Sequence, residues 1–385
     1  MPSRYIDLHI LQDIPASCLN RGQYDEPKTL KIGNTCRAAI SSQCLKRTDR
    51  LEIEDLLDEP AARTRTIPPR VSAALRNAGW PDGLAAFAAT QIARCATSEG
   101  LATDPEAGHR TLAMLYAPAT GLIENLTALC QRHRPALEQG HAAAQTKDAA
   151  RRSATHLPVA EVVAALTGRT ATINLFGRFL AGSNDSHVAG AVQMAWAFTT
   201  HTADSQPDFF TAVEDWAEPG EHGSAHMNTA FLTAGIFYRY ATVNLTELTH
   251  NLGGDQPRAL ALLGLFTETF LMALPSGKNT ATAPHTVPDL VHYVVRDRRP
   301  VSYASAFHRP VQAAPGGGYL APSRQALSEH AASLDQLIGT RRRIAHGHAT
   351  ADDTPVDHLG THHHTFTDLI TTLTGTAARP AQAAP

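Results

Sequence analysis

The sequence lacks the features that define several classes of protein. None of its apolar runs reaches about 18 residues, the length that a membrane-spanning helix needs, so we expect no membrane association. Charge is also scarce, because only 18% of the 385 residues are charged and the formal net charge is −3. This balance argues against a protein that binds polyanions over its whole surface, but it leaves room for a local basic groove.

Cysteine is sparse, and its pattern argues against a disulfide framework. The five cysteines are an odd number and include no Cys-x-x-Cys pair, which favours reduced thiols in a cytoplasmic protein. No signal peptide is expected, because the first residues lead straight into a strand pattern. The glycines at 316–318 are not followed by the Lys-Ser/Thr of a phosphate-binding loop, so no nucleotide cofactor is expected.

Hydrophobic periodicity predicts an α+β fold. An apolar fraction of 43% is enough for a core, and the patterns give the order strand, helix, strand, helix, strand. The first strand is predicted to be half-buried and to end at Pro15, with Ile6 and Ile10 inside and Asp7 and His9 outside. The five segments are residues 5–11, 41–57, 235–245, 257–273 and 287–295.

Two further segments interrupt this order. One is rich in Ala and Leu and predicts a helical insertion, with helical signals at residues 71–79, 83–99, 109–133 and 134–157. The other predicts an extended hairpin, with arms at residues 207–215 and 225–234. The whole order suits an RNA-recognition-motif-like (ferredoxin-like) sandwich with two interruptions. The aromatic motif of RNA-recognition sheets is absent, so RNA is expected beside the sheet rather than on its face.

A basic stretch near the N-terminus is the strongest functional signal. Between residues 21 and 50 there are seven Lys/Arg and three Asp/Glu, a local balance of +4. Cations beside hydroxyl and amide donors suit phosphate oxygens, which need both neutralisation and hydrogen bonds. The alternative is a solvated basic loop that leads into a helix. The candidate ligands are Asn20, Arg21, Lys28, Ser41, Gln43, Lys46, Arg47 and Arg50.

Later segments add candidate phosphate ligands. Lys147 and Arg151 are four residues apart and would share a helical face, although a solvated helix face is the alternative. Arg169 follows Gly168, which permits close backbone approach, and Thr170 adds a hydroxyl.

The predicted hairpin carries side chains that suit bases rather than phosphates. Adjacent aromatic residues on an extended hairpin with an acidic tip are not typical of a core. Such side chains stack on bases, at about 1–3 kcal/mol per base, or they pack the hairpin onto its own domain. The candidates are Phe209, Phe210, Thr211 and Met227.

A series of short segments extends the pattern beyond the basic stretch. They are residues 17–21, 27–31, 40–47, 166–172, 197–201, 208–215, 223–226, 235–240 and 251–254. In this order and with these gaps they resemble CasC, the Cse-type backbone subunit of Cascade, the type I-E CRISPR surveillance complex. The resemblance covers the first fifty residues and residues 166–254 well, and the remainder poorly.

The resemblance implies a domain plan for the chain. A palm would comprise residues 1–59, a connection at residues 191–199, and residues 235–375. A helical fingers insertion would occupy residues 60–190, a β-hairpin thumb residues 200–234, and a mobile tail residues 376–385.

The resemblance also implies a function. The chain would be a non-catalytic subunit that polymerises head to tail along a CRISPR guide RNA, together with other Cascade subunits. Phosphate contacts would hold the guide without reading its sequence, so that its bases stay free to pair with target DNA. The thumb would reach over the RNA held by a neighbouring copy and flip out one base at each subunit.

Two other functions stay open at this level. Related RNA-recognition folds include metal-independent endoribonucleases that process CRISPR precursor RNA, and His201 and His226 are the candidates for acid–base chemistry. Substitution of these two residues would separate cleavage from guide binding. The other alternative is a metal-binding protein built on the histidines at 346, 348, 358 and 362–364. Their spacing is irregular for a zinc site, so no metal or other cofactor is expected.

Overall fold

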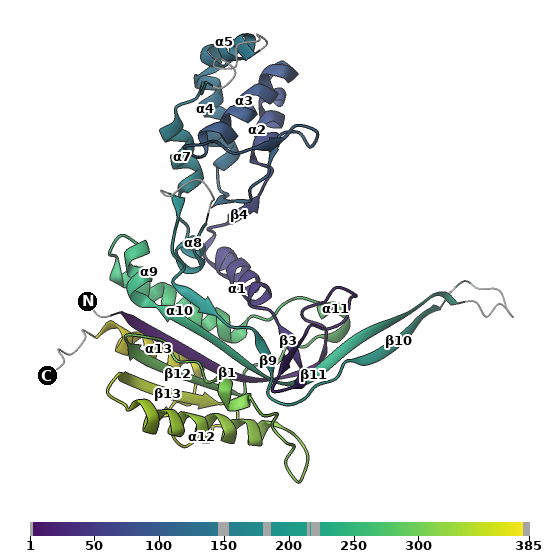
Figure 1. Ribbon diagram of the computed structural model, residues 1–385, viewed down its shortest axis with the longest axis vertical. Helices are drawn as coiled ribbons and strands as arrows, with labels where there is room; N and C mark the ends of the chain where they lie inside the picture. The colour runs from purple at the N-terminus through teal and green to yellow at the C-terminus, as the bar shows by residue number, and fades with distance from the viewer. Residues whose placement is uncertain (1–2, 145–153, 180–185, 214–215, 217–223, 380–385) are drawn as a thin grey trace. The chain divides into compact units, whose positions relative to one another are not determined.

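The computed structural model describes residues 3–144, 154–179, 186–213, 216 and 224–379 (Figure 1). It is a mixed α+β structure that divides into two compact units. The first unit consists of residues 1–52 and 191–385, and the second consists of residues 53–190. Among the described residues, no helix combines the length and the apolar character that a bilayer crossing requires.

A large sheet forms the centre of the first unit. Its middle strand, β1 (Arg4–Ser17), pairs antiparallel with β11 (Ser224–Asn244) on one side and with β12 (Leu290–Asp297) on the other. The strand order is β14-β13-β12-β1-β11-β9-β3-β2, and β8 and β10 also pair with β11. The other strands are β2 (Thr29–Ile32), β3 (Thr35–Ile40), β8 (Val192–Met194), β9 (Ala197–Thr199), β10 (Gln206–Val213), β13 (Arg343–Thr350) and β14 (Thr361–His362).

Both faces of β1 are buried, and the strand continues beyond Pro15, so the predicted half-buried strand is wrong in both respects. Asp7 and His9 are 0% exposed although they alternate with apolar residues. Arg296 donates to the Asp7 carboxylate at 3.0 Å, and the His9 ring stacks on Tyr303 at 4.0 Å between ring centroids. The partners of this polar face come from the far end of the chain, so local periodicity assigned it to solvent.

Two helices cover one face of the sheet. They are α1 (Ser42–Leu57) and α10 (Gln256–Met272), and both confirm helices predicted from the sequence. Leu45 of α1 packs with Phe237 of β11. Two residues further along β11, the Arg239 guanidinium lies 4.8 Å from a ring of α10. α1, which carries much of the basic stretch, therefore rests on the central strand.

The opposite face is covered by α12 (Leu320–Ile338) and by the short helix η2 (Ala304–Phe307). Leu327 of α12 and Phe307 of η2 pack into one apolar cluster with Tyr238 of β11. Residues 236–240 thus alternate between the two covered faces, as expected for a central strand.

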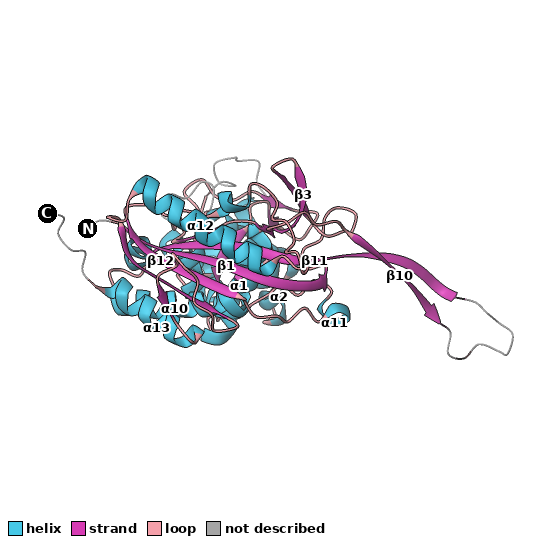
Figure 2. Ribbon diagram, turned by 90° about the horizontal axis from the view of Figure 1, so that it is seen from below, coloured by secondary structure: helices cyan, strands magenta, loops and turns pink. Residues whose placement is uncertain are grey.

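The predicted hairpin is continuous with the central sheet. β11 runs for 21 residues and includes both the second predicted arm and the predicted central strand. β10 pairs with its first part, from Gln206 opposite Leu232 to Val213 opposite Ser224. Figure 2 shows this hairpin extending from the end of the sheet. The turn at residues 217–223 lies outside the described residues.

The second unit is a helical bundle with two small two-stranded sheets, β4–β7 and β5–β6. Its core includes Val71, Leu75, Ile92 and Leu126, all almost fully buried. The helix predicted over residues 109–133 is wrong in its first half, where short strands precede Gly121. Gly121 has φ of 66°, which favours glycine and starts the next helix. The elements are α2 (Ile67–Asn77), α3 (Asp82–Cys95), α4 (Leu122–Arg132), α5 (Arg134–Ala144), α7 (Val159–Thr167), α8 (Ala171–Phe176), β4 (Ala61–Thr64), β5 (Thr103–Asp104), β6 (Arg110–Thr111) and β7 (Leu115–Pro118).

The C-terminal segment folds back onto the sheet. α13 (Phe366–Ala378) contacts β12, β13 and α10. Thr376 and Ala377 are buried, and the Arg4 guanidinium donates to the Ala377 carbonyl at 2.6 Å. The predicted mobile tail therefore starts too early, because residues 376–378 complete a packed helix. Three short helical elements complete the unit: α9 (Leu245–Asn251) and α11 (Asn279–Thr282), besides η2.

Candidate nucleic-acid interface

Asn20 and Ser41 fix the start of α1. The Ser41 amide donates to Oδ1 of Asn20 at 2.8 Å, and the Cys44 amide donates to Oγ of Ser41 at 3.3 Å. Ser41 is also buried, so its hydroxyl acts as a helix cap. The geometry gives these two predicted ligands a positioning role. The first turn of a helix carries backbone N–H groups of the kind that bind phosphate, and this connection holds the turn beside the basic loop.

Two predicted cations meet beside Cys44. Burial raises the pKa of the Cys44 thiol, while Lys28 and Arg47 lie close enough to oppose that rise. Lys28 comes from the loop before β2, and its ammonium sits 5.1 Å from the centre of the Trp196 ring. Arg47 comes from α1 and is exposed. The fold thus brings together a loop cation and a helix cation that are nineteen positions apart.

A second pair of cations meets beside Cys18. Burial raises the pKa of the Cys18 thiol, Lys278 and Arg21 oppose the rise, and the nearby Asp25 and Glu26 add to it. The turn that carries Lys278 lies directly on this loop, since a Cβ on Gly277 would come within 2.5 Å of the Cys18 carbonyl oxygen. Arg21 is exposed and pairs with Asp25 at 2.9 Å.

The two pairs belong to one region of the first unit. The Cys44 thiol donates to the carbonyl oxygen of Leu19, the neighbour of Cys18, at 3.9 Å. We call the cations gathered here the basic surface, defined as Arg21, Lys28, Arg47 and Lys278. Sequence reasoning missed Lys278. Its only signal is a single cation in a short Ser-Gly-Lys-Asn segment, which lies more than 220 positions after the basic stretch.

The remaining predicted residues of α1 follow its outer side. Gln43 is exposed, and Lys46 and Arg50 are half-buried. Leu45 and Asp49 lie on the buried side of the same helix. Gln43 and Arg47 are four residues apart, as are Lys46 and Arg50, so each pair shares a face of α1 and the basic surface extends along the helix.

Arg37 does not belong to this surface, although it lies in the basic stretch. Its side chain is 0% exposed, and burial lowers the pKa of its guanidinium. It donates to the carbonyls of Thr199 at 2.8 Å and Phe307 at 3.0 Å. Arg37 therefore ties β3 to its neighbours, and the local charge excess counted from the sequence overstates the charge on the surface.

A buried charge pair lies beneath α1. Asp49 is 1% exposed, and burial raises the pKa of its carboxyl to about 7, with Arg239 opposing the rise. Burial lowers the pKa of the Arg239 guanidinium to about 10. Gln12 accepts a hydrogen bond from Arg239 at 2.5 Å. Burial therefore shifts the pKa of each group toward its neutral form, and the attraction between the two groups under the helix that carries Arg47 opposes both shifts.

The second unit places Arg169 on an exposed loop. Arg178, which sequence reasoning missed, supports that loop by donating to the carbonyls of Thr167 and Gly168, both at 2.8 Å. Burial lowers the pKa of Arg178, and the nearby charge of Arg169 lowers it further. Thr170 is buried and caps α8 by accepting from the Ile173 amide at 3.3 Å, so its hydroxyl is used within the fold. Lys147 and Arg151 lie outside the described residues.

The hairpin presents apolar side chains to solvent. Phe209 and Met227 are each 65% exposed, and Phe210 is 44% exposed. Thr211 pairs directly with Met227 across the strands, so these two and Phe209 share one face, while Phe210 points to the other. Trp216, near the tip, is 93% exposed and was not among the predicted residues.

His201 has a structural environment. Its ring is 5% exposed and stacks on Tyr319 at 3.7 Å between centroids. Nε2 accepts from the Ile236 amide at 3.1 Å, and Nδ1 is 2.8 Å from the Thr202 carbonyl oxygen. Both ring nitrogens are thus engaged, and burial lowers the pKa of the ring. The side chain of His226 lies outside the described residues.

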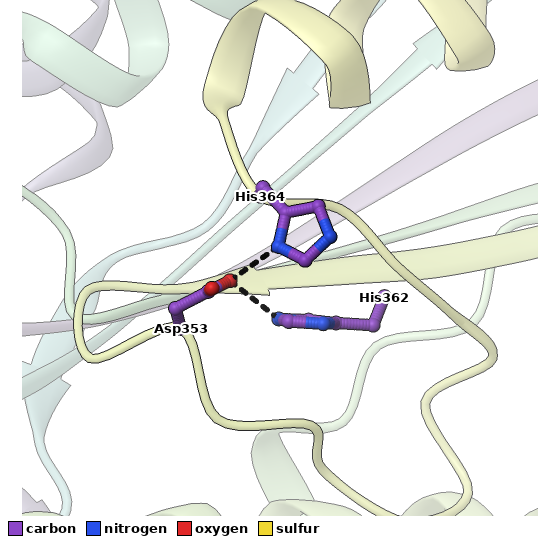
Figure 3. A group of neighbouring side chains, drawn as sticks. All are labelled: Asp353, His362 and His364. Atoms are coloured by element: carbon purple, nitrogen blue, oxygen red, sulfur yellow. Dashed lines mark hydrogen bonds and ion pairs between the residues drawn. The ribbon is translucent and has the colours of Figure 1, made fainter.

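Two of the C-terminal histidines face one carboxylate, and His348 lies next to them, with its ring centroid 5.2 Å from that of His362. His362 and His364 converge on the Asp353 carboxylate (Figure 3). His348 is almost fully buried, and its Nε2 accepts from the Val356 amide at 2.9 Å. Of the histidines that the sequence analysis grouped together, His362 and His364 share a carboxylate partner. That partner, Asp353, was not among the predicted residues.

Comparison with known proteins gives a family and many similar solved chains. The model of the family described as CT1975-like protein matches residues 6–372. A chain of a "CRISPR RNA-guided surveillance complex, pre-nicking" is 36% identical with a TM-score of 0.86, covering 97% of this chain and 100% of that chain. A chain of a "CRISPR RNA-guided surveillance complex" is 30% identical with a TM-score of 0.77, covering 96% of this chain and 99% of that chain. Among curated proteins the search finds no match.

Proposed function

The chain belongs to the CT1975-like protein family, and from this membership and the basic surface we propose that it is a CRISPR RNA-binding backbone subunit of a type I-E Cascade surveillance complex. Two structural relatives, 36% and 30% identical, are chains of RNA-guided surveillance complexes, so guide RNA and other Cascade subunits are its partners in this proposal. Copies of the chain polymerise head to tail along the guide and present its bases to invading DNA. In this proposal the complex acts in the cytoplasm, because a reducing compartment suits the five free cysteines.

The observation that carries the proposal is the convergence of four cations from three segments: the loop between β1 and β2, α1, and the turn before α11. Arg21, Lys28, Arg47 and Lys278 gather around Cys18 and Cys44, beside the first turn of α1. Charged side chains next to a helix N-terminus suit a phosphodiester backbone. Contacts of this kind carry no base information, which is what a subunit that accepts any spacer sequence needs.

The sheet topology supports the predicted palm. The four strands β12-β1-β11-β9 lie in this order, and α1 and α10 cover one face. A β-α-β-β-α-β chain with its first strand between the third and the last is the ferredoxin-like arrangement. We therefore retain the RNA-recognition-motif-like palm as part of the proposal, with the second compact unit as fingers.

In the same proposal the β10–β11 hairpin is the thumb. Phe209 and Met227 present apolar surface on the face they share with Thr211. Side chains of this type stack on bases or wedge between them, without a hydrogen-bond code. The hairpin of one copy is assigned to the RNA segment held by the next copy, where it displaces one base.

No catalytic role is included in the proposal. A metal-independent endoribonuclease needs a titratable side chain that can reach a 2′-hydroxyl. His201, one of the two candidates, is buried and hydrogen-bonded at both ring nitrogens. This environment favours a role in holding the base of the hairpin.

Sequencing of the bound RNA tests the proposal. The chain is expressed with the other Cascade genes and a CRISPR array, purified, and its RNA is sequenced. We expect RNAs of unit length with constant repeat-derived ends and variable middles. A preparation without nucleic acid, or with random cellular RNA, would contradict a guide-holding role.

A matched pair of variants connects this result to the basic surface. Lys28→Glu with Arg47→Glu is expected to remove most of the bound guide, because phosphate contacts are replaced by repulsion. Arg341→Glu is the control, since Arg341 is exposed and its neighbour Arg342 pairs with Asp297, at the opposite end of β1. Equal RNA content in the two variants would contradict the assignment of this surface.

A further inference from the structure

Three potential metal ligands meet at the C-terminal edge of the sheet. The Asp353 Oδ1 atom lies 2.8 Å from Nδ1 of His364 and 3.3 Å from Nε2 of His362 (Figure 3). All three ligand atoms lie within 4.8 Å of one another. Among the residues that the structure describes, this is the one group of three or more His, Cys, Asp or Glu side chains with such convergence.

The two segments that carry these residues are held independently of any ion. Asp353 sits in a turn closed by its amide, which donates to the Thr350 carbonyl at 3.1 Å. His362 belongs to β14, where it pairs with His348 of β13. His364 directly precedes Thr365, which caps α13 by accepting from the Asp368 amide at 3.0 Å. The backbone thus delivers the three side chains to one point.

Asp353 occupies a turn position with φ of 55°, in the left-handed region that aspartate adopts more readily than most residues other than glycine. An exposed ion pair contributes only about 0–1 kcal/mol, so the contacts between Asp353 and the two imidazoles add little to stability by themselves. A bound cation would make these contacts much stronger, because it would coordinate all three groups at once.

We propose that Asp353, His362 and His364 bind a divalent transition-metal ion of the zinc type. Two imidazole nitrogens and one carboxylate oxygen form a ligand set that zinc commonly accepts, with a fourth position left for water or another donor. Bonds of about 2.0–2.1 Å in tetrahedral geometry place ligand atoms about 3.3 Å apart, so side-chain shifts of about 1 Å close the site.

Burial and exposure agree with a site that an ion can reach. The His362 side chain is 16% exposed, and its Nε2 is buried without a well-formed hydrogen bond among the described residues. Asp353 and His364 have side chains that are 58% and 74% exposed. One imidazole therefore anchors the ion, and the two other ligands close over it from the solvent side.

The site would cross-link the C-terminal elements of the first unit. It joins the turn after β13 to the start of α13 across the intervening loop. These elements lie on the far side of the sheet order from β2 and β3, so this metal site is separate from the basic surface and does not depend on RNA binding.

Metal analysis of the full chain tests the site directly. The chain is purified without a polyhistidine tag, stripped with chelator, dialysed against micromolar zinc and analysed by elemental mass spectrometry. We expect a single zinc ion per chain, and at least about tenfold weaker binding after His364→Ala or Asp353→Asn. His358→Ala is the matched control, because His358 lies in the same loop but outside the cluster, and it is expected to retain the ion.

Cobalt substitution and thermal unfolding supply the second readout. A tetrahedral cobalt(II) spectrum is expected for the native chain and for His358→Ala, but not for His364→Ala. Zinc is expected to raise the melting temperature of the same two proteins only. His364 is exposed, so its replacement leaves the fold intact and the comparison valid even where Asp353→Asn is less stable. Absence of binding, or stoichiometry unchanged by His364→Ala, would overturn the proposal.

Discussion

The basic surface and the β10–β11 hairpin offer nucleic acid two different kinds of contact. The basic surface gathers cations from three segments, and neighbours such as Trp196 and Asp25 help to place them. The hairpin instead exposes Phe209 and Met227 through local strand pairing. Charge contacts weaken with salt, whereas stacking contacts do not depend on counterion release. The two regions are therefore distinguishable in one titration.

The largest effect is expected from reversing two charges of the basic surface. Lys28→Glu with Arg47→Glu should weaken binding of single-stranded RNA by at least about 100-fold, because each charge-assisted contact contributes about 1.5–3 kcal/mol. The slope of log K against log salt should fall by about 1.4, which is two contacts at about 0.7 each. Filter binding of the purified chain over a salt series measures both values. A weaker affinity with an unchanged slope would assign the loss to misfolding.

Truncation of the hairpin face should have a smaller effect of a different kind. Phe209→Ala with Met227→Ala is expected to weaken binding about tenfold, since loss of one stacked base costs about 1–3 kcal/mol. The salt slope should stay at the native value. Thr229→Ala, on the same face of β11 opposite Phe209, is the control for strand integrity. A changed slope would show that the hairpin acts through charge and would remove the contrast between the regions.

Lys278→Ala tests whether the turn before α11 belongs to the basic surface. We expect about tenfold weaker binding, by the same contribution of about 1.5–3 kcal/mol per charge-assisted contact, and a slope reduced by about 0.7, the value of one lost phosphate contact on a single strand. The control is Arg258→Ala, an exposed cation in the first turn of α10. If Lys278→Ala and Arg258→Ala have the same RNA affinity and the same salt slope, Lys278 does not belong to the basic surface.

Asp49→Asn should change stability and leave RNA affinity almost unaltered. Burial raises the pKa of Asp49 to about 7, above its ordinary value of 3.8, so the folded state holds a proton that the unfolded chain releases. This contribution to stability is present at low pH and is lost as pH rises from about 4 to about 7. The difference in melting temperature, Asp49→Asn minus native chain, should therefore be more positive at pH 8 than at pH 5.

Asp55→Asn provides the control for this pH effect, because Asp55 is exposed on the same helix. Its melting curve should follow that of the native chain at both pH values. Parallel pH profiles for Asp49→Asn and the native chain would show that Asp49 is ionised in the folded state.

Local sequence patterns predicted the helices and strands, but they did not predict which distant residues would contact each other. The 3.6-residue pattern identified α1 and α10, because amphipathic helices show their buried side in the sequence. The alternation of β1 was also read correctly, but Asp7 and His9 were assigned to solvent. Their partners Arg296 and Tyr303 are almost 300 positions away, and no local period reveals such a pairing.

The candidate site shows the same division. Arg37 and Arg47 are both arginines of one basic stretch, yet the first is fully buried and the second is exposed. Asn20, Ser41 and Thr170 were predicted as ligands, and the structure uses their side chains in hydrogen bonds that hold the loops. Residue type predicted the chemistry of the region without deciding which atoms are available.

The sequence by itself determined the α+β order, the basic character of residues 21–50 and the apolar character of the hairpin, because these properties depend on residues close together in the chain. Tertiary structure alone decided that Lys278 joins the basic surface and that Asp353 meets His362 and His364. Side chains from distant segments meet only when the strands that carry them pair, and the register of that pairing is set by burial of the whole sheet.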